Sequence, residues 1–186
     1  MALESAFQDL CERTRRCLDA AQALRLTVVE DRPLRDGALL ADWLGDAAEG
    51  LVGDLEQAHG AAVEAYRAAA LARDLALARR ALATCHERTI AASLGYSAEL
   101  GSYDRLSELI RLGRRRKGEW RAWSGSVREA LDACPPPLGD LNQALCSCWQ
   151  ELAERATPPP ITVHAIGISS GPPRIDDEPI LGRRTP

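Results

Sequence analysis

The N-terminal part of the chain alternates apolar and polar positions with the period of an α-helix. Apolar or small side chains recur in alternating steps of four and three, as on the contact stripe of a coiled coil. The stripe comprises Leu3, Phe7, Leu10, Thr14, Cys17, Ala21, Leu24 and Val28. It predicts a helix over about residues 2–30, followed by a turn at Pro33, which has no amide proton. The β-branched run 26–29 would also suit a short strand, but the unbroken stripe favours helix.

A second stripe begins at Leu40 and shifts its phase near Leu71. The pattern allows either one long helix over residues 36–93 or two helices separated by a break. Each glycine in a helix interior costs about 1 kcal/mol relative to alanine. We therefore expect a kink or break at the glycines of this stretch, Gly50, Gly53 and Gly60.

The remainder of the helical region is divided by glycine and proline. Gly95 and Gly101 indicate a junction, and a further apolar stripe runs from there to Leu131, before a cysteine and three prolines at 134–137. Asp140 is expected to cap the last helix. The sequence thus predicts an all-α fold over residues 1–157, an antiparallel bundle of four or five helices on short connections.

Residues 158–186 form a C-terminal tail of different composition. It begins with three consecutive prolines and holds seven of the eleven prolines of the chain, which predicts an extended, non-helical segment. Apolar residues alternate with polar ones after the prolines, as in a β-strand with a one-residue slip. A lone strand needs partners for its amides, so the segment is disordered, packed on the bundle, or added to a sheet of another molecule. We expect partner-binding residues here at Ile161, Val163, Ile166, Ile168, Ile180 and Leu181.

Charge is distributed unevenly along a chain whose formal net charge is −4. Residues 101–131 carry eight basic and four acidic side chains, an excess of +4, which leaves −8 on the rest. The most basic part lies beside Trp120 and Trp123, a combination that can meet an acidic protein surface, or bind phosphates and stack on bases. The alternative is a solvated helix face with both tryptophans in the core. The partner-binding candidates of this segment are Arg114, Arg115, Arg116, Lys117 and Trp120.

The sequence offers little for metal binding or catalysis. Glu56 and His59 form the single Glu-x-x-His motif, whereas a di-iron bundle needs two such motifs and two further glutamates. Adjacent residues such as Cys85 and His86 point to different faces of a helix, as do the close pair Cys146 and Cys148. There is no Gly-rich phosphate loop and no nucleophile elbow. We therefore predict no catalytic, cofactor-binding or metal-binding residues, and six cysteines that are mostly reduced.

The expected compartment is the cytoplasm, because no apolar run reaches the length of a membrane span and the N-terminus carries acid rather than the basic residues of a signal peptide. We expect a non-catalytic adaptor or regulatory subunit that binds a protein partner through the bundle and the tail, with self-association also open. The alternative is a nucleic-acid-binding regulator that uses the basic segment 111–123.

Overall fold

The computed structural model describes residues 3–30, 32–33, 38–112 and 117–156. These residues form five α-helices and one short π-helix, which confirms the predicted helical bundle. The elements are α1 (Leu3–Val29), α2 (Ala38–Tyr66), η1 (Arg67–Leu71), α3 (Leu75–Leu112), α4 (Lys117–Asp132) and α5 (Pro135–Ala156). The run 26–29 is helical, as the apolar stripe favoured. In this part of the chain, no helix combines the length and the apolar character that crossing a membrane requires.

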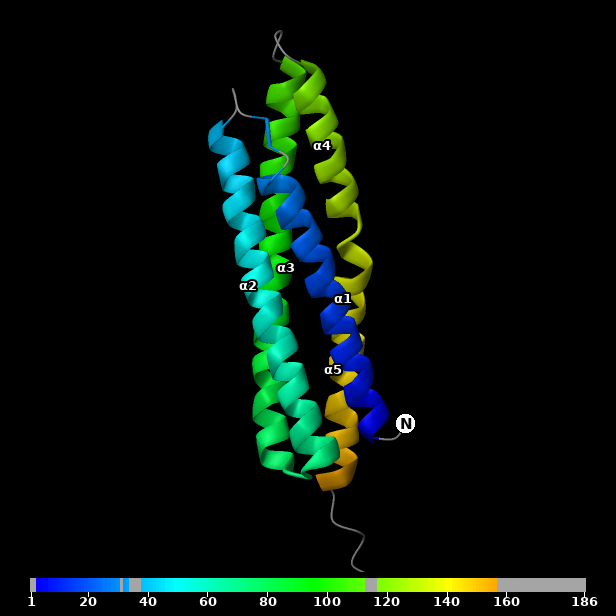
Figure 1. Ribbon diagram of the computed structural model, residues 1–186. Helices are drawn as coiled ribbons and strands as arrows, with labels where there is room; N and C mark the ends of the chain where they lie inside the picture. The colour runs from blue at the N-terminus through cyan, green and yellow to red at the C-terminus, as the bar shows by residue number, and fades with distance from the viewer. Residues whose placement is uncertain (1–2, 31, 34–37, 113–116, 157–186) are drawn as a thin grey trace, which may run out of the picture.

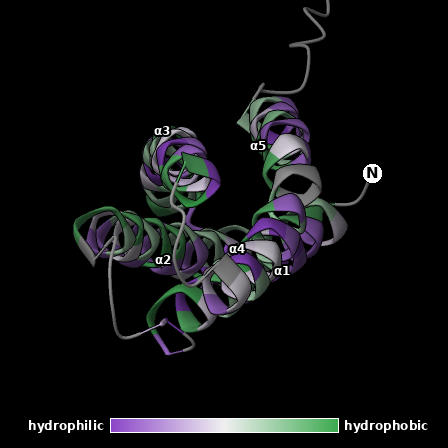
Figure 2. Cartoon of the chain, turned by 90° about the horizontal axis from the view of Figure 1, so that it is seen from above, coloured by the Kyte–Doolittle hydropathy of each residue, from purple (hydrophilic) through white to green (hydrophobic). Residues whose placement is uncertain are grey.

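The helices stand in four antiparallel columns (Figure 1). The chain runs along α1, returns along α2, runs again along α3, and returns along α4 followed by α5, which continues down the same side of the molecule. Seen from above, α2 and α3 form one side of the bundle and α1, α4 and α5 the other (Figure 2). The fourth column is thus a helix interrupted at Cys134, just before the prolines that open α5.

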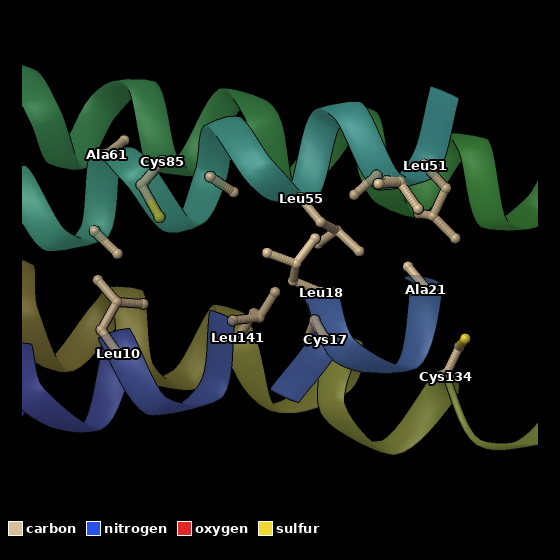
Figure 3. Packing of buried hydrophobic residues seen from close by; sticks show 14 of the residues in the cluster. Leu10, Cys17, Leu18, Ala21, Leu51, Leu55, Ala61, Cys85, Cys134 and Leu141 are labelled. Atoms are coloured by element: carbon tan, nitrogen blue, oxygen red, sulfur yellow. The ribbon is translucent and has the colours of Figure 1, made fainter. Parts of the chain in front are cut away.

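The core is built mainly from leucine and alanine. All eight positions of the stripe predicted in the first helix are buried. Figure 3 shows Leu10 and Leu18 of α1 facing the α2 side chains around Leu55 and Ala61. A run of buried alanines in the second half of α2, from Ala58 to Ala65, lets the neighbouring helices approach closely, because alanine ends at its Cβ atom. Among the described helices, α2 and α3 have the most extensive packing.

The break in the second stripe lies at its phase shift and not at the glycines. The expected break at Gly50, Gly53 and Gly60 was wrong: all three are inside α2, where an added Cβ would meet nothing within 4 Å. The chain reverses over residues 67–74 instead. The amide of Ala72 donates to the carbonyl of Arg67 at 2.8 Å, a π-type bond, and the Asp74 carboxylate accepts a bond from the Leu77 amide at 3.0 Å and caps α3.

Two further boundaries differ from expectation. The junction predicted at Gly95 and Gly101 is absent, because α3 runs unbroken through both; burial along α2 outweighs the modest helix cost of glycine. The last helix begins at Pro135 and not after Asp140, since proline needs no amide partner in the first turn of a helix. Asp140 lies inside α5, where its carboxylate pairs with Arg13 of α1 at 3.2 Å.

Arg73 adopts a left-handed backbone conformation in the α2–α3 turn, with φ of 59°. This conformation costs a residue with a Cβ atom about 1 kcal/mol or more, a cost that glycine does not have. We expect Arg73→Gly to raise the free energy of unfolding by up to about 1 kcal/mol in chemical denaturation. The control is Arg80→Gly, an exposed position inside α3, which should lower the same quantity by about 1 kcal/mol. Equal destabilisation by both changes would contradict the strain at Arg73.

Candidate functional site

The basic segment is described only in part. Arg114, Arg115 and Arg116 lie outside the described residues, and Lys117 is the first residue of α4. Trp120, which we expected at a partner-binding surface, is instead buried, with 7% of its surface exposed.

Both tryptophans of this segment are buried, and Trp123 joins α4 to α1. The rings of Trp120 and Trp123 meet edge to face with centroids 5.3 Å apart. The indole Nε1 of Trp123 donates to the carbonyl oxygen of Thr27 at 3.0 Å. That carbonyl belongs to the last turn of α1, where helical carbonyls have no partner within the helix. The two aromatic rings are therefore structural, and neither offers the exposed face that stacking on a base requires.

The predicted tail residues Ile161, Val163, Ile166, Ile168, Ile180 and Leu181 lie outside the described residues. Their role as partner-binding residues stays a prediction.

The metal-binding alternatives find no support in the described part of the chain, where no three His, Cys, Asp or Glu side chains are grouped to hold an ion. Glu56 is exposed, whereas His59 turns toward α1 and its Nδ1 lies 3.0 Å from the Thr14 hydroxyl. Burial and the nearby Arg15 lower the pKa of His59. This histidine therefore joins α1 to α2 as a neutral ring.

The six cysteines are all free thiols. Burial raises the pKa of four of them to about 12, those of Cys17, Cys85, Cys134 and Cys148. Cys11 is half-buried, and burial raises its pKa to about 11. A thiol with such a pKa is not a nucleophile at neutral pH, so these side chains act as small apolar core residues. Cys146 alone of the six is exposed.

Exposed large hydrophobic side chains are not scattered evenly over the described residues. Six of the ten lie where α1 ends, α2 begins and α3 ends, which we call the distal end of the bundle (Figure 1). The six are Leu26, Val29, Leu39, Trp43, Leu109 and Leu112. Leu39 and Trp43 are one helical turn apart on α2 and are 74% and 53% exposed.

Two of the other four exposed hydrophobics line a groove between α3 and α5. Its volume is about 310 Å³. The wall from α3 includes Ile90 and Leu94, 49% and 68% exposed, and the wall from α5 includes Leu138 and Leu145. Trp149, 37% exposed, follows Leu145 by one helical turn on the same side of α5. Polar groups between these side chains come from serines of α3 and from Asn142.

Glu99 is the one fully buried acid in the described core. Its side chain is 0% exposed, and both carboxylate oxygens have no hydrogen-bond partner among the described residues. Burial raises the pKa of Glu99 to about 8, so the group is protonated at neutral pH. A negative charge on Glu99 would disfavour the thiolate of Cys134 at the α4–α5 junction, and it contributes to the raised pKa of that thiol.

Sequence reasoning missed Trp43, Glu99 and the groove, although the first two left a signal. Trp43 precedes Leu44 of the α2 stripe by one residue, which turns it about 100° away from the core. Glu99 lies seven residues after Ala92 and seven before Leu106, so it shares their buried stripe. The groove depends on how far α5 stands from α3, which no local pattern encodes.

Comparisons with protein-family models, with curated proteins and with solved structures found no match to this chain.

Glu99 gives a prediction about pH. The folded state keeps the proton up to about pH 8, whereas an unfolded glutamate loses it near pH 4.5. The contribution of Glu99 to the free energy of unfolding is therefore fully present below pH 4.5. It is lost as the pH rises toward 8, at roughly 1.4 kcal/mol per pH unit at most. We expect Glu99→Gln to flatten this decline and to be more stable than the wild type by a few kcal/mol at pH 9, in denaturation curves from pH 5 to 9. The exposed Glu56→Gln is the matched control, and parallel curves for wild type and Glu99→Gln would contradict the assignment.

The thiols give a second prediction. The native protein should show one fast-reacting cysteine with an aromatic disulfide reagent, and Cys146→Ser should abolish that fast phase. Denaturation should expose the remaining thiols to the reagent. A fast phase that survives in Cys146→Ser would show that a core cysteine is accessible.

Proposed function

We propose that this chain is a non-catalytic adaptor or regulatory subunit that binds a protein partner through the distal end of its bundle and through its C-terminal tail, 158–186. The observation that carries the proposal is the gathering of six exposed large hydrophobic side chains at one end of the described bundle. Scattered surface leucines are ordinary, but a concentration of them that includes a half-exposed tryptophan is typical of interaction sites.

The charge of the same region suggests the chemistry of the partner. Residues 101–131 carry an excess of +4, and Arg105, Arg111 and Arg121 are exposed in the described part of that stretch. Exposed apolar side chains and exposed arginines toward the same end of the bundle favour a segment that is both apolar and acidic, such as an amphipathic helix with glutamates on its polar face. The tail adds a second, linked contact, which raises the overall affinity without a larger surface on the bundle.

A protein partner is favoured over nucleic acid for a specific reason. Trp120 and Trp123 are buried, so the basic segment lacks the aromatic platform for bases that its sequence suggested. A second copy of this chain is a further candidate for the distal end, and the oligomeric state in solution tests it directly.

The proposal predicts which changes abolish partner capture. The 186-residue chain and three variants, Trp43→Ala, Leu71→Ala and a deletion of 158–186, are used as bait, and captured proteins are quantified by mass spectrometry. We expect one and the same protein to be lost at least about tenfold with Trp43→Ala and with the deletion, because truncating a central tryptophan costs roughly 2 kcal/mol or more of binding energy. Leu71→Ala is the matched control, an exposed leucine of η1 far from the distal end.

The variants must keep their fold for the comparison to count. Each should retain its helical circular dichroism and a melting temperature within a few degrees of the full chain, since changes at exposed positions alter stability by about 0.5 kcal/mol. Identical captured proteins for all four baits would overturn the proposal. Binding to DNA or RNA at low salt that disappears on charge removal at 114–117 would favour the nucleic-acid alternative instead.

A further inference from the structure

We propose that the groove between α3 and α5 is the docking site of segment 161–168 of the same chain. The proposal concerns contacts within one molecule, and a partner that binds residues 161–168 would have to displace them from the groove.

The groove has the chemistry that an extended apolar peptide needs. Its exposed aliphatic side chains, Ile90 and Leu94, would lose water contact beneath such a peptide. The hydroxyls of Ser93 and Ser97 donate to carbonyls of their own helix at 3.0 and 3.1 Å, which leaves their oxygens able to accept bonds from peptide amides. On the opposite wall the Asn142 side chain offers both a donor and an acceptor.

The size of the groove limits what it can hold. Ligand pockets have volumes of roughly 300–1,000 Å³, and a groove of about 310 Å³ is near the lower limit. It accommodates a few side chains of a short segment, and not the face of a folded domain. Segment 161–168 has this form, because its isoleucines and valine are separated by small or polar residues.

The tail begins close enough to the groove for residues 161–168 to reach it. The tail follows Ala156, the last residue of α5 (Figure 1). Trp149 lies about 10 Å and Asn142 about 21 Å back along α5 from that point, at 1.5 Å per helical residue. An extended chain covers about 13 Å in residues 157–160 and about 26 Å more in residues 161–168. A tail that turns back beside α5 therefore brings its prolines to the level of Trp149 and its aliphatic residues to the groove.

The order of side chains along this path also matches. Prolines 158–160 would reach the half-exposed indole of Trp149, and proline-rich segments commonly dock on exposed aromatic rings. Ile161 and Val163 would then lie between Leu145 and Leu94. The chain thus presents its prolines to Trp149, one helical turn beyond the groove on α5, and its aliphatic residues to the aliphatic side chains of the groove itself.

The covalent connection favours binding of this segment over binding of an unlinked peptide. A segment tethered by a few residues has an effective concentration in the millimolar range at its site. Even weak intrinsic affinity therefore keeps the groove occupied by the tethered segment, whereas a free peptide of equal affinity would need a similar millimolar concentration to compete.

Hydrogen exchange of the full-length protein, followed by mass spectrometry, tests the proposal. We expect amides of 161–168 to exchange at least about tenfold more slowly than in an unstructured peptide, at every protein concentration. The double variant Ile90→Glu/Leu94→Glu changes two exposed groove positions and should remove most of this protection. Leu39→Glu/Leu109→Glu is the matched control, with two exposed leucines changed at the distal end, and should leave it intact.

A reciprocal variant avoids any change to the helices. Ile161→Asp/Val163→Asp alters the tail alone and should increase the oxidation of Trp149 by hydroxyl radicals at least about twofold, since the indole would lose its cover. Rapid exchange of 161–168 in the wild type would overturn the proposal. So would protection that survives both groove substitutions, or protection that disappears on dilution, which would assign the groove to a second copy. Partner capture through Trp43 is measured separately, so failure here leaves that result intact.

Discussion

Burial of the apolar stripe of α1 is the interaction on which the rest of the structure depends. This helix packs against α2 on one side and against α4 and α5 on the other, so it joins the α2–α3 hairpin to the fourth column. Directional contacts then fix each neighbour: Trp123 bonds the last turn of α1, His59 meets Thr14, and Arg13 reaches Asp140. The exposed ion pairs add less than about 1 kcal/mol each and chiefly set the relative position of the columns.

The uneven exposure of hydrophobic side chains is a result of how these columns end. The helices differ in length, and α3 is the longest at 38 residues, so its last turns extend beyond the start of α2 (Figure 1). Side chains that would be covered in a bundle of equal helices therefore remain exposed at the distal end. The groove between α3 and α5 has a related origin. Because α1 lies between α2 and α5, α3 packs less extensively against α4 and α5 than against α2, and space remains between α3 and α5.

Sequence patterns predicted the class of the fold and the first helix to within about a residue, because a continuous stripe of eight buried positions has one helical solution. They failed where propensity and packing compete. Glycines 50, 53, 60, 95 and 101 weaken a helix locally, yet burial along the α2–α3 seam kept each of them helical. The surface candidates were less predictable. Trp120 was expected at a binding surface because it adjoins arginines, whereas its ring packs against Trp123 and is buried.

One unbroken helix carries both surfaces of interest. Leu109 and Leu112 at the distal end and Ile90 and Leu94 at the groove all belong to α3, about 30 Å apart along its axis. Each turn of an α-helix is hydrogen-bonded to the next, so an unbroken helix fixes the positions of its residues relative to one another. The two regions therefore stand at a set distance and angle, and any partner that contacts both must span that length of α3.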